Sequence, residues 1–159
     1  MEPVRDAYPA WAAPALPRKS VLAAFDFKSP DKRYLGAAKD GVLNGVEKGG
    51  FCYAGVESDT AMFPAPAKGE FRVTVWTERE DPITLRLRVL KPESTAYDYV
   101  LEKPVPGRPV TVRVPLEAFR SFEGNRLVAG DRVHILYVFC RELKSRIRID
   151  DLAILEEVP

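Results

Sequence analysis

From Val21 onward the chain is a succession of short runs in which apolar and polar residues alternate, separated by Gly, Pro, Asp and Asn. The clearest run is residues 71–78, where Phe and Val occupy every second position, and residues 84–90 repeat the scheme with Leu and Val. Alternation with a period of two is typical of a strand that has one face on a core. The pattern therefore predicts strands, not helices.

Further runs of this kind predict about eight to ten strands in all, at residues 21–27, 51–56, 96–102, 109–114, 133–140 and 146–155 besides the two above. We expect residues 96–102 and 109–114 to form an antiparallel pair around the Pro106-Gly107 turn. Residues 115–119 are too short for a helix and indicate a crossover turn. Many short strands with turn residues between them predict an all-β fold, a two-sheet antiparallel β-sandwich of jelly-roll type.

The first 19 residues have a different composition, with Pro3, Pro9, Pro14 and Pro17 among several alanines. Proline opposes both helix and central strand, so residues 1–19 are expected to be a linker or a docking arm and residues 20–159 the sandwich domain. Tyr8 and Trp11 are the large aromatic residues of this arm, and they either dock on the domain or serve no structural purpose there.

The overall charge argues against nucleic acid as a partner. The 24 Lys and Arg residues balance 23 Asp and Glu residues, which leaves a net charge of +1 and no general basic field. No apolar stretch approaches the ~18 residues of a membrane span. The N-terminus lacks a basic segment followed by an apolar one, so no secretory signal is expected in this sequence.

Two cysteines, Cys52 and Cys140, are too few for a disulfide scaffold and lack the paired spacing of a zinc site. Both lie in apolar strands, which predicts two buried thiols, with a single bridge as the alternative. His134 is the only histidine and lies in an apolar strand, so a buried or edge histidine is expected there, not a catalytic one.

Three segments resemble noncatalytic carbohydrate-binding modules of the galactose-binding-like superfamily. They are Phe25-Asp26-Phe27, the run from Val112 to Phe119, and Ile149-Asp150-Asp151-Leu152-Ala153-Ile154 near the end. The resemblance extends over about residues 21–156 and implies a jelly-roll sandwich that binds a polysaccharide or oligosaccharide. The same fold also occurs in proteins that bind other proteins, so the fold does not decide the function.

Domains of this type often carry a structural calcium ion between the first and last strands. The resemblance points to Asp26, Asp150 and Asp151 as its ligands, which carbonyl groups and waters would have to complete. Alternatively, the adjacent carboxylates accept backbone hydrogen bonds at a twisted strand end or pair with Arg146 or Arg148. No organic cofactor is expected.

The candidate ligand-binding face carries one tryptophan, three arginines and two tyrosines: Trp76, Arg72, Arg86, Arg88, Tyr97 and Tyr99. An aromatic ring stacks on the apolar face of a sugar, and arginine forms paired hydrogen bonds with carboxylate or sulfate. Together they predict binding of an acidic polysaccharide. Alternatively, Trp76 is covered and the arginines are a solvated face. If the two tyrosines belong to the core, Asp98 is the exposed residue between them.

No sequence motif indicates an enzyme, because a Gly-x-Ser-x-Gly elbow, a phosphate loop and a His-Glu-x-x-His helix are all missing from the sequence. We therefore expect a noncatalytic module that targets a larger enzyme or a cell-surface protein to its polysaccharide. Such a module would work outside the cell or in the periplasm, although a cytoplasmic location stays open. The alternative is a protein-interaction or assembly domain on the same sandwich.

Overall fold

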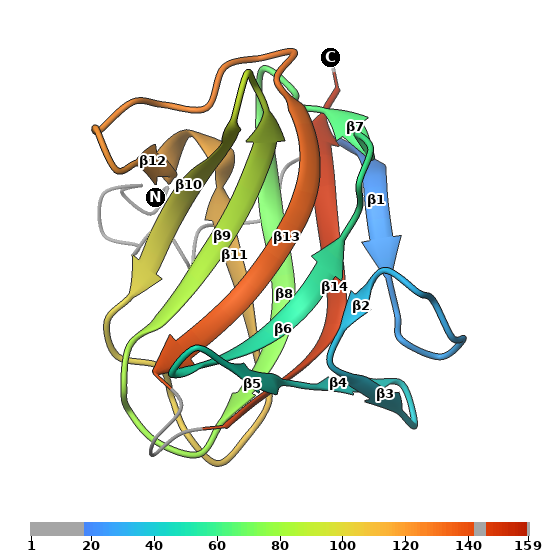
Figure 1. The fold of residues 1–159 in the computed structure, drawn as a ribbon, viewed down its shortest axis with the longest axis vertical. Coiled ribbons are helices and arrows are strands. Elements are labelled where there is room, and N and C mark those ends of the chain that lie inside the picture. Colours follow the sequence, from blue (N-terminus) through green and yellow to red (C-terminus); the bar gives the residue numbers. More distant parts are fainter. Residues whose placement is uncertain (1–17, 142–145, 159) are drawn as a thin grey trace, which may run out of the picture.

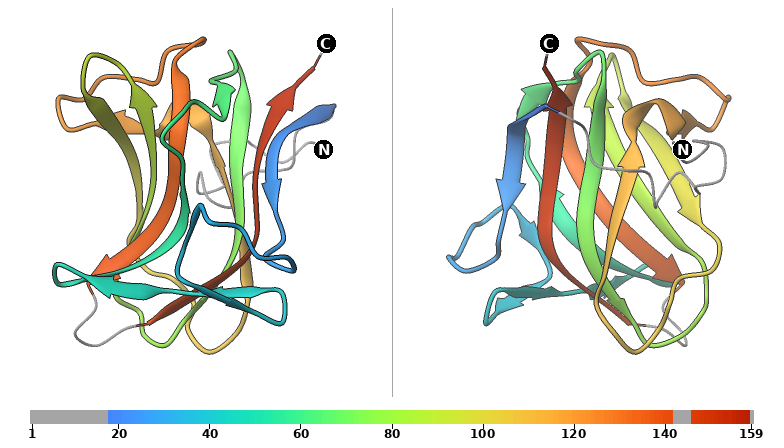
Figure 2. Two further views of the ribbon diagram at one scale, coloured as in Figure 1. Left: turned by 45° about the vertical axis from the view of Figure 1, so that its right-hand side comes forward. Right: turned by 180° about the vertical axis from the view of Figure 1, so that it is seen from behind.

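Two antiparallel sheets face each other in the computed structural model, which describes residues 18–141 and 146–158 (Figures 1 and 2). The six-stranded sheet comprises β1 (Lys19–Phe25), β3 (Ala37–Lys39), β4 (Val42–Asn44), β8 (Gly69–Thr77), β11 (Val110–Pro115) and β14 (Ile147–Glu157). The eight-stranded sheet comprises β2 (Tyr34–Leu35), β5 (Val46–Lys48), β6 (Phe51–Glu57), β7 (Phe63–Pro64), β9 (Ile83–Leu90), β10 (Ser94–Leu101), β12 (Arg120–Ser121) and β13 (Arg132–Arg141). The predicted all-β sandwich is confirmed.

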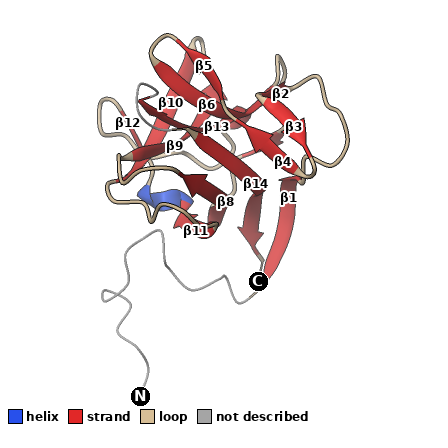
Figure 3. Ribbon diagram, turned by 90° about the horizontal axis from the view of Figure 1, so that it is seen from below, coloured by secondary structure: helices blue, strands red, loops and turns tan. Residues whose placement is uncertain are grey.

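Helical structure in the described residues is limited to one 3₁₀ turn, η2 (Leu116–Ala118), which Figure 3 shows beside β11 and β8. It lies in the predicted crossover turn. Leu116 and Phe119 are buried at its two ends, and the Phe119 ring stacks on Phe71 with 5.7 Å between ring centroids. The turn therefore closes one end of the core. No helix in the described part of the chain is long and apolar enough to cross a membrane.

The core fills the space between the sheets because each long strand turns its apolar residues to the same side. On β9 the residues Leu85, Leu87 and Val89 have no exposed surface, while Arg86 and Arg88 between them face outward and are only partly buried. β8 follows the same rule with Phe71, Val73 and Val75. Alternation in the sequence thus corresponds directly to the inner and outer faces.

The assignment of strands to sheets differs from the expected one in two respects, the grouping of residues 71–78 and 84–90 on one face and the pairing of residues 96–102 with 109–114. β8 and β9 follow each other in the sequence but belong to opposite sheets, since β8 pairs with β11 and β14 while β9 pairs with β10 and β13. The expected pair of residues 96–102 with 109–114 is also wrong, because β10 and β11 lie in different sheets. Alternation shows that a strand has one buried face. Because strands of both sheets show the same alternation, the pattern does not tell which sheet a strand joins.

The chain passes from the six-stranded to the eight-stranded sheet at Gly45, between β4 and β5. The Gly45 amide donates to the carbonyl of Ile147 at 2.9 Å. A Cβ atom at this position would lie 2.5 Å from the Sγ atom of Cys52, so only glycine fits the corner without a rearrangement.

The first strand of the described residues pairs with the last one. β1 includes Lys19, which the sequence had placed in the arm, and Lys19 lies opposite Glu157 of β14. The amide of Val158 donates to the carbonyl of Arg18. The predicted docking of Tyr8 and Trp11 lies outside the described residues.

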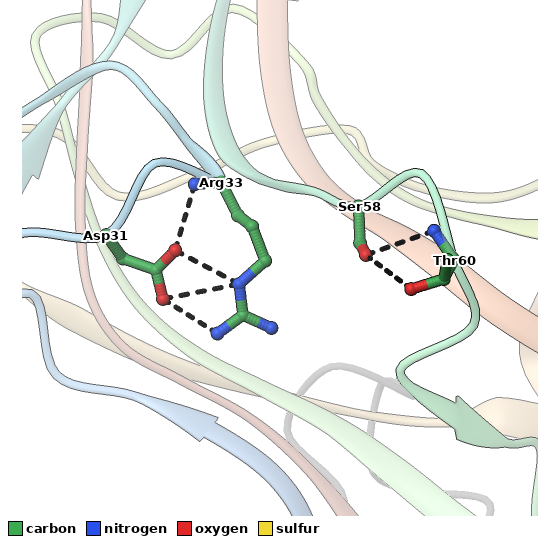
Figure 4. Close-up of polar contacts among 4 residues, drawn as sticks. All are labelled: Asp31, Arg33, Ser58 and Thr60. Atoms are coloured by element: carbon green, nitrogen blue, oxygen red, sulfur yellow. Dashed lines mark hydrogen bonds and ion pairs between the residues drawn. The ribbon is translucent and has the colours of Figure 1, made fainter.

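The loop before β2 is held by an ion pair within one turn. Asp31 accepts hydrogen bonds from the backbone amide of Arg33 at 2.9 Å and from its guanidinium Nη2 at 2.7 Å (Figure 4). These bonds hold the pKa of the Asp31 carboxyl at about 2, below its usual 3.8. Figure 4 also shows Ser58, whose hydroxyl accepts a hydrogen bond from the amide of Thr60 in the loop after β6.

Candidate functional site

The outer side of the eight-stranded sheet carries a group of aromatic and arginine side chains, which we call the aromatic face. It consists of Phe51 and Tyr53 on β6, Arg86 and Arg88 on β9, and Tyr137 and Phe139 on β13. The register of the strands brings them together, because Tyr53 lies opposite Phe139 and Tyr137 lies opposite Arg86. These are three adjacent strands in the middle of the sheet (Figure 1).

The four rings of the aromatic face touch one another. Tyr53 is 5.3 Å from Tyr137 and 5.0 Å from Phe139, and Phe51 meets Phe139 edge-on at 5.8 Å between ring centroids. Tyr137 and Phe139 are each only 8% exposed, whereas Phe51 and Tyr53 are partly exposed. The rings of β6 are therefore the ones most open to a ligand, and those of β13 lie against them.

The backbones of β6 and β13 approach each other closely beside these rings. Gly55 lies opposite Tyr137, and a Cβ atom there would lie 2.0 Å from the Leu136 carbonyl oxygen, so the position requires glycine. Glu57, two residues further along β6, accepts a hydrogen bond from the Tyr137 hydroxyl. This hydrogen bond holds the Tyr137 side chain in place.

Arg86 is fixed in place by Asp98 on β10. The two residues are direct cross-strand neighbours, and Nε and Nη2 of Arg86 donate to the two carboxylate oxygens of Asp98 at 2.7 and 2.8 Å. Hydrogen bonding to Asp98 raises the pKa of the Arg86 guanidinium above its usual value. The same guanidinium lies over the Phe139 ring, 4.8 Å from its centroid. Arg86 therefore has its charge compensated and its plane packed on the aromatic face.

Arg88 has a different environment. Its Nη1 donates to the backbone carbonyl of Ser94 at 3.2 Å, and it makes no ion pair with a carboxylate among residues 18–141 and 146–158. Burial, and next the neighbouring charge of Arg86, lower the pKa of the Arg88 guanidinium. Arg88 is thus a partly buried cation with no ion-pair partner among the described residues, and the nearby Asp98 carboxylate offsets the effects on its pKa only in part.

Two hollows lie on this side of the molecule, and Phe51 lines both of them. One hollow, of about 350 Å³, is lined by Leu35, Lys48, Gly49, Phe51, Tyr53, Arg86, Arg88 and Tyr137, and we call it the cationic hollow. The other, of about 420 Å³, is lined by Phe51, Asp81, Pro82, Thr84, Phe139, Cys140 and Arg141, and we call it the apolar hollow. Both are open depressions along the aromatic face, not deep pockets with converging titratable groups.

The predicted binding residues do not form a single face. Trp76 and Arg72 lie on the outer side of β8 in the six-stranded sheet, whereas Arg86 and Arg88 lie on the outer side of the opposite sheet. Their grouping is therefore wrong, and Figure 2 shows the separation of the two layers. Trp76 has its own surroundings: the Arg148 guanidinium lies 5.6 Å from its ring, beside a hollow of about 290 Å³.

Tyr97 and Tyr99 are a second correction, because both turn toward the core. Tyr97 is 2% exposed, and its hydroxyl accepts a hydrogen bond from Nζ of Lys91 at 3.0 Å. Tyr99 packs against Phe119, with 6.2 Å between the ring centroids. Asp98, the residue between them, faces outward, as expected for the case in which the tyrosines are core residues.

The three aspartates predicted to bind calcium have other roles in the structure. Asp26 accepts the amide of Lys28 at 3.0 Å, and Asp150 accepts the amide of Asp151 at 2.7 Å. The register of β14 shifts between Asp150 and Ala153, and Asp151 has a φ of 53°, so this pair forms a β-bulge. Within the described residues, no group of three or more Asp, Glu, His or Cys side chains is placed to hold a metal ion. The calcium site stays a prediction, and the backbone hydrogen bonds of the alternative are present at Asp150.

His134 and the cysteines are structural, as expected. His134 is buried, its Nδ1 lies 2.9 Å from the Ser58 carbonyl, and its Nε2 lies 2.9 Å from the Ser94 hydroxyl. Because a carbonyl only accepts, Nδ1 carries the proton. Cys52 and Cys140 lie directly opposite each other on β6 and β13, and both are buried thiols.

Sequence reasoning missed Phe51, Tyr53, Tyr137 and Phe139 as functional residues. The strands that carry them are apolar at nearly every position, so the contrast between polar and apolar residues is lost. A weaker signal is present in the alternation along β13, where the two aromatic rings point to one face of the strand and Leu136, Val138 and Cys140 point to the other. Aromatic rings gathered on one face of an apolar strand would have indicated the outer face of the sheet.

No family model matches the sequence, and no curated protein matches it. Among solved structures, the chain is similar to a family 30 carbohydrate-binding module, with a TM-score of 0.53 and 11% identity over 87% of this chain and 84% of that one. It is also similar to the family 11 module of the cellulosomal cellulase Lic26A-Cel5E of Clostridium thermocellum, with a TM-score of 0.52 and 11% identity over 91% and 97% of the two chains.

A second kind of similar structure is longer than this chain. The agarase AgWH50C aligns with a TM-score of 0.56 and 9% identity over 89% of this chain but 25% of its own. PfGH50B aligns with a TM-score of 0.55 and 12% identity over 84% of this chain and 23% of its own. The chain thus spans about a quarter of the length of these two proteins. At such low identity the comparisons show the fold, that of carbohydrate-binding modules, which agrees with the resemblance in the sequence.

Proposed function

We propose that this protein is a noncatalytic carbohydrate-binding module that holds a polysaccharide on the aromatic face. The observation that supports it best is the group of touching rings on β6 and β13 beside the arginines of β9, with two open hollows that Phe51 lines. Aromatic rings bind the apolar faces of sugars, and arginines donate hydrogen bonds that orient them.

The face is suited to binding without a conformational change. Its residues lie on central strands that are hydrogen-bonded on both sides, and the alternate residues on the other face of each strand are buried in the core. Sites built on such elements are held more precisely than sites on loops. A preformed surface avoids the entropic cost of ordering a loop around the ligand.

The polysaccharide is an acidic one in this proposal. Lys48, Arg86 and Arg88 line the cationic hollow, and no carboxylate is among the lining residues of the described chain. Cations of this kind form charge-assisted hydrogen bonds with uronate or sulfate groups.

The biological role in this proposal is targeting of a larger enzyme or cell-surface protein, outside the cell or in the periplasm. It is supported by two similar structures, one of them an agarase, in which the matching region is about a quarter of a longer chain. The module would then bring the attached protein to its polysaccharide and perform no chemistry itself.

A glycan array with neutral, uronic and sulfated polysaccharides tests the proposal, followed by titration calorimetry with the best ligand. Tyr53→Ala is expected to weaken binding at least about tenfold, because stacking area is lost. Trp76→Ala is the matched control, since it removes a partly exposed ring from the opposite sheet, and it should leave binding unchanged. Equal loss in the two variants, or no binding by the wild type, would contradict the proposal.

A further inference from the structure

The two hollows that meet at Phe51 differ in charge. The cationic hollow has three basic side chains in its wall, Lys48, Arg86 and Arg88. The apolar hollow has Phe51, Pro82 and Phe139 in its wall, together with one acidic residue, Asp81, and one basic residue, Arg141. The formal charge is therefore concentrated at one end of the aromatic face.

The three cations of the cationic hollow are not equivalent. Arg86 is compensated by Asp98 through two hydrogen bonds of 2.7 and 2.8 Å. Arg88 is partly buried beside it, and its one hydrogen bond to a described residue goes to the uncharged carbonyl of Ser94. Lys48 is exposed at the rim, on β5, and makes no ion pair within the described residues. An anionic group in this hollow would find its counter-charges in Arg88 and Lys48.

Partial burial of a guanidinium that has no ion-pair partner costs free energy, and a ligand anion would offset that cost. The lowered pKa of Arg88, caused by burial and by the charge of Arg86, reflects the same unfavourable surroundings. Arg86 is less suited to bind a ligand anion, because its Nε and Nη2 already donate hydrogen bonds to the Asp98 carboxylate. Arg88 is thus the residue with the most to gain from an anion.

We infer that the aromatic face is divided into an anion subsite around Arg88 and Lys48 and a neutral stacking subsite around Phe51, the partly exposed ring that lines both hollows. The ligand class that fits this division is a polysaccharide in which a charged sugar, bearing a carboxylate or a sulfate, alternates with a neutral sugar. A fully charged polymer would place a second anion against the apolar hollow. The inference rests on the proposed function and specifies its ligand.

Calorimetry with four oligosaccharides of matched length tests the inference. Hyaluronan and κ-carrageenan oligosaccharides alternate a charged and a neutral unit, with carboxylate and sulfate respectively. Oligogalacturonate is charged at every unit, and agarose oligosaccharides are neutral. The wild type should bind at least one of the alternating ligands about tenfold or more tightly than the other two classes, and the better of the two identifies the anion.

Arg88→Gln should lower affinity for the preferred alternating ligand to about that for the neutral one, and flatten its dependence on salt. Arg88→Lys should restore part of the affinity, since it keeps the charge but not the fork. Arg148→Gln is the matched control, because it removes an arginine that lies over a ring of the opposite sheet. Circular dichroism and melting curves establish that the variants fold.

The possible failures are distinguishable. If the wild type binds none of the four ligands, the proposed function itself is wrong. If it binds agarose oligosaccharides as tightly as the alternating ones, or if Arg88→Gln weakens all ligands by the same factor, only the division of the face is overturned. Tightest binding of oligogalacturonate would overturn the neutral subsite.

Discussion

Asp98 lies directly opposite Arg86 on neighbouring strands, and its two carboxylate oxygens accept hydrogen bonds from two different nitrogens of the Arg86 guanidinium. Both side chains are more than two-thirds buried. A paired geometry of this kind holds the guanidinium over the Phe139 ring, 4.8 Å from its centroid. The carboxylate therefore acts on the aromatic face although it does not line either hollow.

Asp98→Asn is expected to reduce the free energy of unfolding by about 1–3 kcal/mol, since hydrogen bonds to a charged group are lost and the Arg86 charge is left uncompensated. Urea unfolding measures the change. Asp81→Asn is the control, because Asp81 and its partner Arg79 are about half exposed and 3.5 Å apart, and it should change stability by less than about 1 kcal/mol. A similar effect of both substitutions would show that the paired geometry does not matter.

Leu87→Ala is expected to cost about 2–5 kcal/mol of unfolding free energy, because Leu87 has no exposed surface and its removal leaves a cavity between the sheets. Val100→Ala on the neighbouring strand β10 is the comparison. Val100 is 45% exposed on the outer side, so its truncation should change stability by less than about 1 kcal/mol. The urea unfolding midpoints of the two variants show whether the inward side chains of β9 contribute more to stability than an outward side chain of β10.

Asp31 predicts a specific loss of stability in acid. Its pKa of about 2 in the folded protein lies below the usual 3.8, so the carboxylate stabilises the fold above pH 3.8 and loses this effect as the pH falls toward 2. Asp31→Asn should therefore be less stable than the wild type at neutral pH, and the difference should shrink through this acid range. Melting temperatures at a series of pH values measure it. A constant difference down to pH 2 would contradict the role of the Asp31–Arg33 pair, and the exposed Asp59, changed to Asn, serves as control.

Calcium is expected to leave the melting temperature of the protein unchanged relative to EDTA. A ligand that binds only the folded state raises the melting temperature, and calcium requires six to eight oxygens. Within the described residues no group of three or more Asp, Glu, His or Cys side chains is placed to hold a metal ion, and Asp26 and Asp150 each accept a backbone amide while Asp151 lies 3.9 Å from Arg72. A rise in the melting temperature with calcium that EDTA reverses would support the site that the sequence resemblance implied and contradict this expectation.

Individual strands were predictable from the sequence, whereas their assignment to sheets was not. Alternation identified β8 and β9 because apolar residues fill alternate positions of each strand, apart from Thr77 at the end of β8, and these are the buried positions in both strands. Which sheet a strand joins depends on contacts between distant segments, such as Trp76 with Arg148 across β8 and β14. The grouping of Trp76 with Arg86 failed for this reason.

The candidate site was partly predictable. Arg86 and Arg88 were identified because charged residues stand out in an apolar strand, whereas the rings of β6 and β13 did not stand out among apolar neighbours. The resemblance at Asp150 and Asp151 correctly indicated the closing strand of a sandwich. The backbone gives its own reason for an aspartate at position 151, since a bulge with a positive φ favours this residue type.

The pairing of Lys19 with Glu157 has a consequence for the mechanical behaviour of the domain. Hydrogen bonds of an antiparallel ladder run perpendicular to its strands, so a force that pulls these two residues apart acts along the bonds at one end of the ladder. The hydrogen bonds between β1 and β14 would then break one after another, starting at this end, and β1 would be the first strand to detach. The strands of the aromatic face, β6, β9 and β13, are not part of that ladder, so the pulling force does not act directly on the surface proposed to hold the polysaccharide.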